Sequence, residues 1–149
     1  MSSPNFGNSL SVLHCEYDFT VQGGAVGDIA LTAGDNNTQN AQLPAGATIL
    51  AICAAVQTAP TSGGGATIML TTATDAPALA GGLSGALPIA QFAVSNGVNV
   101  TGILTNTPLT NPSVNNYMTV AQNVQATVAT AALTAGRIHW YILYTNGFI

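Results

Sequence analysis

The 149-residue sequence is unusually poor in charge, with a single basic residue, Arg137, and five acidic residues. An ordinary soluble domain carries about 25% charged residues, against 4% here, so we expect partners to cover much of the surface. One arginine cannot form the basic groove that binds nucleic acid, and no run of about 20 apolar residues is present that could cross a membrane.

The first nine residues differ from the rest of the chain. They are rich in Ser, Asn, Pro and Gly, with Phe6 as the single aromatic. A segment of this composition forms no core of its own, so we expect a flexible arm over 1–9 and a single β-sandwich domain over 10–149. The N-terminal stretch through Phe19 lacks the basic leader and apolar core of a secretory signal, so no such signal is expected.

The first half of the chain predicts four strands. Apolar and polar residues alternate over Leu13–Val21, which is typical of a strand with one face in the core. Gly23-Gly24 ends this segment, and a second short strand is predicted over Asp28–Thr32. Thr48–Thr58 is apolar on both faces, as expected for a central strand, and Ala66–Thr72 predicts the next strand.

The second half is richer in turns. Long loops are predicted over Thr74–Leu87 and Thr105–Asn116, and Asn96-Gly97 is a strong hairpin signal. The strands predicted between and after these turns are Pro88–Val94, Val98–Leu104, Tyr117–Ala121, Val124–Thr130 and Arg137–Thr145. About eight or nine short strands without a long helix predict an all-β fold, an antiparallel β-sandwich or jelly roll.

The alternation in the first and last long strands predicts the core. The residues expected to be mostly buried are Leu13, Tyr17, Phe19, Ile49, Ile52, Ile68, Ile138, Trp140 and Ile142. Because closing a sandwich often brings terminal strands together, we expect Arg137 to meet Glu16 or Asp18. A partly exposed ion pair contributes at most ~1 kcal/mol, so Arg137→Ala should reduce stability only modestly.

Three polar residues of the first strand, His14, Glu16 and Asp18, share one face and allow two interpretations. A metal site would need convergent geometry and a further ligand, and His139 is the only other histidine. A polar stripe facing solvent is the simpler interpretation.

The cysteine, histidine and serine residues of the sequence do not predict a catalytic site. Cys15 and Cys53 are expected to be buried free thiols, because no secretion signal accompanies them. His14 precedes Cys15, but adjacent strand residues point to opposite faces and form no dyad. No serine lies in a nucleophile elbow. We therefore expect no catalytic, cofactor-binding or metal-binding residues, no cofactor, and a protein that is not an enzyme.

The last strand concentrates large aromatic side chains. Trp140 and Tyr141 must point to opposite faces, so either both faces are covered or one ring lies at an interface. An exposed ring here predicts an oligomer contact or a surface that stacks on sugars. The residues predicted to contact partners or other copies are Phe6, Arg137, His139, Tyr141 and Phe148.

Three segments together resemble small bacteriophage capsid decoration (cement) or head-fibre proteins. Leu43–Ile49 (LPAGATI) is similar to the entry into a central strand of that family, and Ser62–Leu70 (SGGGATIML) to its next hairpin. Leu133–Tyr144 resembles its closing strand. The order and spacing match over about two thirds of the chain. The resemblance implies a β-sandwich or jelly roll that trimerises and clamps neighbouring major capsid subunits from outside.

The function expected from these observations is that of a structural virion protein. It would decorate and stabilise a bacteriophage capsid as an oligomer, a homotrimer, with the major capsid protein as its partner and without nucleic acid or membrane. Its location would be the capsid exterior, after assembly in the host cytoplasm. The alternatives are a trimeric carbohydrate-binding or adhesive tip module of a phage fibre, and a small shell protein that assembles by itself.

Overall fold

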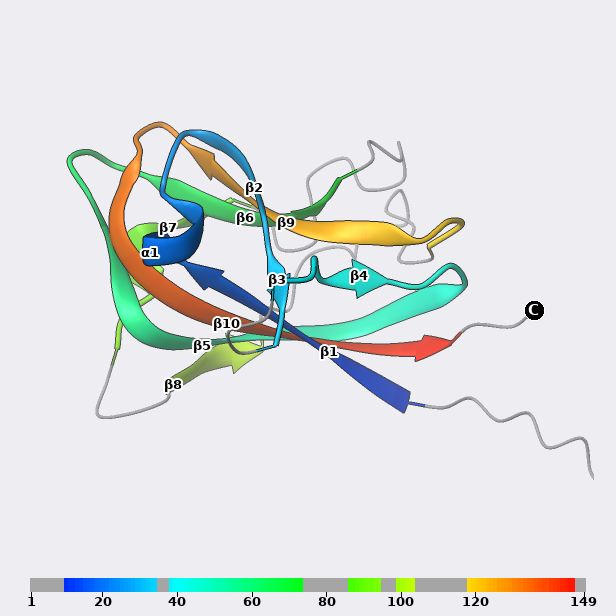
Figure 1. Cartoon of the computed structure of the whole chain (residues 1–149). Helices are drawn as coiled ribbons and strands as arrows, with labels where there is room; N and C mark the ends of the chain where they lie inside the picture. Colours follow the sequence, from blue (N-terminus) through cyan, green and yellow to red (C-terminus); the bar gives the residue numbers. More distant parts are fainter. Residues whose placement is uncertain (1–9, 35–37, 74–85, 95–98, 104–117, 147–149) are drawn as a thin grey trace, which may run out of the picture.

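The computed structural model describes residues 10–34, 38–73, 86–94, 99–103 and 118–146. Within them, two antiparallel sheets pack face to face (Figure 1). The first sheet has the order β3-β1-β10-β5-β8, formed by Thr32–Ala33, Leu10–Asp18, Leu133–Asn146, Ala47–Ser62 and Asn99–Ile103. The prediction of an all-β antiparallel sandwich is confirmed.

The second sheet has the order β2-β9-β6-β7, and β4 also pairs with β9. These strands are Gly27–Ala30, Gln122–Ala129, Thr67–Thr72, Leu87–Pro88 and Gln42–Leu43. Two short helical turns lie between strands: α1, Phe19–Gln22, and the 3-10 helix Ile89–Gln91. None of the helices formed by the described residues has the length and apolar character needed to cross a lipid bilayer.

The two longest strands, β5 and β10, pair along most of their length and curve strongly (Figure 1). Their register shifts several times between Leu133 and Ile138. Each shift is a bulge or irregularity that lets a strand bend. Gly136 lies in this bend with φ 142°, and an added Cβ would be 3.1 Å from Pro60. The bend therefore requires glycine at this position.

The terminal strands lie side by side, as predicted. β1 pairs with β10 from Leu10↔Thr145 to Asp18↔Arg137. Seven of the residues predicted for the core are buried: Tyr17, Ile49, Ile52, Ile68, Ile138, Trp140 and Ile142. Leu13 and Phe19 pack against the edge of the core and are less completely buried than the other seven.

β1 ends before Val21, the last residue of the strand that the alternation predicts. It stops at Asp18, whose side chain accepts a hydrogen bond from the backbone N–H of Thr20 and so caps α1. This local hydrogen bond competes with the strand, as short acidic side chains often do. As a result Phe19 begins the helix, and the side chain of Val21 is 73% exposed.

Two other predicted strands are wrong. In place of a strand over Pro88–Val94, the chain turns at Ile89–Gln91 and directs Phe92 into the core, where its ring meets Trp140 edge-on. In place of a strand over Tyr117–Ala121, Met118 exchanges backbone hydrogen bonds with Gly46 and Ala47, and the strand begins at Gln122.

Several predictions fall on other parts of the chain. The N-terminal arm over 1–9, the turn at Asn96-Gly97 and most of the two long loops lie outside the described residues.

Candidate interaction surface

One outward face of the first sheet gathers most of the predicted contact residues. Even-numbered residues of β1 point away from the second sheet, as do their cross-strand partners on β10. We call this surface the β1–β10 face; its polar residues are His14, Glu16, Asp18, Arg137, His139, Tyr141 and Thr145. Phe6 and Phe148, which were also predicted as contacts, lie outside the described residues.

An ion pair anchors one end of the β1–β10 face. Arg137 Nε lies 2.5 Å from Glu16 Oε1 and 3.6 Å from Asp18 Oδ2, so Arg137 meets both predicted acids. The Glu16 side chain is only 3% exposed, whereas that of Arg137 is 25% exposed. The prediction that Glu16 belongs to a solvent-facing polar stripe is therefore wrong. On the side of Glu16 away from β10, Thr32 of β3 pairs with Glu16 and donates a hydrogen bond from its hydroxyl to the Glu16 carbonyl.

The second acid of this group is held in its ionised form. Asp18 accepts hydrogen bonds from the Thr20 hydroxyl at 2.7 Å and the Thr20 backbone N–H at 2.8 Å. The pKa of the Asp18 carboxyl is lowered, mainly by the hydrogen bond from the Thr20 hydroxyl. The hydrogen bond from the Thr20 backbone and the charge of Arg137 lower it further. Because this pKa lies below its unfolded value, the stability that Asp18 contributes is present at neutral pH and is lost as the pH falls through the lowered pKa.

The centre of the face is a hydrogen-bonded histidine pair. His14 Nε2 lies 3.0 Å from His139 Nδ1, and His139 Nε2 lies 3.0 Å from Gln57 Oε1. Since an amide oxygen only accepts, His139 donates from Nε2 to Gln57. The Tyr141 ring stacks on His14 at 4.7 Å. These contacts fix the orientation of both histidine rings.

The other end of the face is apolar, which the sequence reasoning missed. Leu10 and Val12 are 62% and 59% exposed, and Val12 pairs with Leu143 of β10. Both belong to β1, although the predicted strand begins only at Leu13. The sequence could have placed Leu10 and Val12 on this face, because they lie four and two residues before His14 and alternate residues share one face of a strand. The face thus joins uncharged polar, aromatic and apolar groups.

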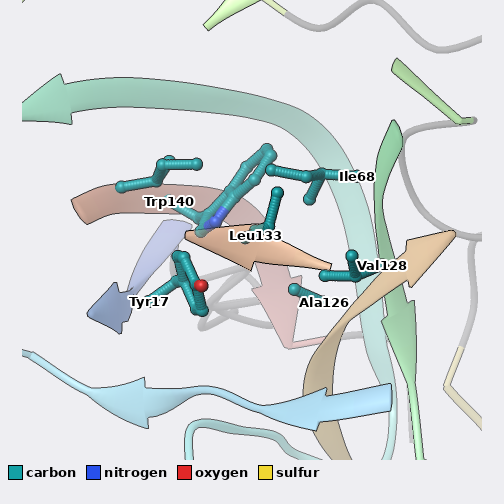
Figure 2. Close-up of a pocket in the computed structure, with 7 residues that line it drawn as sticks. Tyr17, Ile68, Ala126, Val128, Leu133 and Trp140 are labelled. Carbon is teal, nitrogen blue, oxygen red and sulfur yellow. The ribbon is translucent and has the colours of Figure 1, made fainter. Parts of the chain in front are cut away.

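The two adjacent aromatic residues separate cleanly between the faces. Trp140 is fully buried, and Tyr141 is partly exposed on the β1–β10 face. Figure 2 shows Trp140 and Tyr17 in a seam between the sheets that is also lined by Ile68, Leu133 and other apolar residues. This seam has no space for a water molecule. It is a packing contact and not a ligand cavity.

No metal centre is formed by the part of the chain that the structure describes, where no group of three His, Cys, Asp or Glu side chains converges. Cys15 and Cys53 are both free thiols, as predicted. Cys15 is buried against the core, and burial raises the pKa of its thiol to about 12. Cys53 is only half-buried, so the prediction of a buried thiol is wrong for this residue; partial burial still raises its pKa.

The two thiols should therefore differ in reactivity. The thiolate is the nucleophile, so an inaccessible thiol with a raised pKa reacts only when the chain unfolds. At pH 8 we expect Ellman's reagent to modify Cys53 in the folded protein and Cys15 only in denaturant. The Cys53→Ala variant should show no reactive thiol until it unfolds. A folded Cys53→Ala protein that reacts as fast as the unfolded chain would contradict the burial of Cys15.

Comparisons with known proteins yield structural neighbours only. No protein-family model matches the sequence, and no curated protein matches it. A chain in the acidic stable capsid structure of Helicobacter pylori bacteriophage KHP30 has a TM-score of 0.51 at 14% identity, with 91% of this chain and 86% of that chain covered. A chain of the cyanophage Pam1 capsid asymmetric unit has a TM-score of 0.45 at 16% identity, with 97% and 91% covered. The first similarity shows a shared fold.

Proposed function

We propose that this chain is a structural virion protein that decorates and stabilises a bacteriophage capsid from outside. The observation that carries the proposal is the fold shared with a chain of a phage capsid structure, which extends over most of both chains. Two further observations support it. The chain is 4% charged, and its single basic side chain is paired with Glu16 at the edge of the core.

The proposed partners are the major capsid protein and other copies of the chain, assembled as a homotrimer on the capsid exterior. A trimer matches a three-fold position of a capsid lattice without strain. Assembly is expected in the host cytoplasm. No nucleic acid, membrane or cofactor is part of the proposal, and neither is catalysis.

The mechanism we propose is mass action on the assembled lattice. A ligand that binds only the assembled form stabilises it by RT ln(1 + [L]/Kd), which is about 2.7 kcal/mol per site at a hundredfold excess over Kd. The β1–β10 face suits such contacts. Its His and Tyr side chains, together with the adjoining Gln57 of β5, can form hydrogen bonds without the desolvation penalty of buried ions.

Heating shells of the major capsid protein with and without the purified chain tests this function. We expect the chain to raise the temperature at which the shells fall apart. Tyr141→Ala should weaken this effect because it removes a large ring from the β1–β10 face, whereas Val120→Ala, at a 53% exposed position elsewhere, should not. Shells that dissociate at the same temperature with and without the chain would refute the proposed stabilisation.

The alternative function is a carbohydrate-binding or adhesive tip module. Sugar recognition would require a free aromatic face, and one face of the Tyr141 ring is already covered by His14. Binding of the purified chain to glycans but not to shells would favour this alternative. Closed particles formed by the chain alone would instead identify it as a shell protein.

A further inference from the structure

We propose that the edge of β1 at Leu10–Leu13, which no other described strand covers, pairs with the same edge of a second copy, joining the first sheets of two chains across a two-fold axis. The inference goes beyond decoration of a capsid, because it names a surface and its occupant. The predicted trimer has a three-fold axis, so the two contacts would use different parts of the molecule.

Among the described residues, this edge has no partner strand over a short, defined stretch. β3 pairs with β1 only at Cys15 and Glu16, and the last backbone hydrogen bond that the described residues form on that side runs from the Gly34 N–H to the His14 carbonyl at 2.9 Å. Alternate residues of a strand direct their backbone groups to the same side. Val12 and Leu10 therefore present their N–H and C=O groups outward, where β1 extends beyond β3 (Figure 1).

The side chains on this edge do nothing to prevent pairing. Natural edge strands are commonly protected by Lys, Pro, a bulge or an inward charge. The stretch from Leu10 to Leu13 contains none of these and has no charged residue. Leu10 and Val12 are instead among the most exposed large apolar residues of the described chain.

The free stretch is complementary to itself, and this points to a second copy as the occupant. With Ser11 on the two-fold axis, Leu10 of each chain lies opposite Val12 of the other. Each such pair would exchange both N–H···O bonds of an antiparallel ladder. The His14 carbonyl, already bonded to Gly34, is not needed. Two identical chains repel at a net charge of −4, so a contact without charged residues suits them.

Cysteine cross-linking tests both the contact and its register. In this register the two Ser11 residues form a non-hydrogen-bonded pair with Cα atoms about 4.5 Å apart, within the range of about 4.4–6.8 Å that a disulfide spans. In a Cys53→Ala background, we expect Ser11→Cys to form a covalent dimer on mild oxidation, at least tenfold faster than Val120→Cys. Val120 is 53% exposed, more than the partly buried Ser11, and it lies outside β1, so its cross-linking rate reports random collision.

A second substitution in the Ser11→Cys protein separates pairing from random collision. Val12→Pro removes the outward N–H while leaving the bonds to β10, and Val12→Asp places a like charge in the contact. Either should reduce cross-linking to the rate of Val120→Cys while Trp140 fluorescence remains that of the folded chain. The proposal would be overturned if Ser11→Cys and Val120→Cys cross-link at the same rate, or if neither Val12 substitution changes the rate. Cross-linking of Ser11→Cys only to the major capsid protein would overturn it as well. Shell binding by an uncross-linked chain would leave the proposed decoration intact.

Discussion

Replacing Trp140 with alanine is expected to lower the free energy of unfolding by about 3–5 kcal/mol. The side chain is fully buried and its ring meets Phe92 edge-on, with centroids 5.5 Å apart. It also packs in the seam between the sheets together with Tyr17 and Leu133 (Figure 2). The indole Nε1 has no hydrogen-bond partner among the described residues. The loss therefore comes from apolar contact and the cavity left behind.

Denaturant unfolding followed by circular dichroism measures this loss, because the variant lacks the only tryptophan. Val26→Ala is a suitable control, since Val26 is 57% exposed and should change stability by less than about 0.5 kcal/mol. Trp140→Phe should fall between the two, because it keeps an aromatic ring and removes the unpaired N–H. A Trp140→Ala protein as stable as the control would contradict the observed packing between the sheets.

Replacing Arg137 with alanine is expected to cost about 3 kcal/mol, several times more than the sequence predicts. The sequence-based value assumed that both partners are partly exposed, but the Glu16 side chain is only 3% exposed and lies against the guanidinium. Removing the cation leaves a buried negative charge without the group that compensates it. Asp18 loses its charged neighbour as well.

A double-mutant cycle isolates this effect. Glu16→Gln keeps the shape of the side chain but removes the charge, so Arg137→Ala should cost much less in that background. We expect a coupling energy of about 2 kcal/mol between the two sites from denaturant unfolding. A coupling near zero, with equal losses in both backgrounds, would show that Arg137 stabilises the fold only through the packing of its stem.

The alternating pattern at both ends of the chain was sufficient to predict the sandwich and the pairing of its terminal strands. Ile138, Trp140 and Ile142 are buried because the period of two carries that information directly. The end of β1 could not be predicted in this way. The hydrogen bond from the Thr20 N–H to Asp18 starts a helical turn, and this local bond overrides the alternation.

The β1–β10 face was only partly predictable. Arg137, His139 and Tyr141 follow from alternation along the last strand, and the contact with Glu16 follows from pairing of the terminal strands. Gln57 was missed because β5 reaches His139 through tertiary packing, and no local pattern in the sequence indicates it. The burial of Glu16 likewise depends on its neighbour β3, a strand of only two residues.

Sedimentation of the purified chain with assembled shells and with unassembled subunits of the major capsid protein tests the proposed virion role most directly. We expect saturable binding to the shells, with a fixed number of chains for each capsid subunit, and no binding to the free subunits. Such a difference is what allows a ligand to stabilise the lattice. A chain that remains in the supernatant with shells, or that binds free subunits equally well, would contradict the role proposed here.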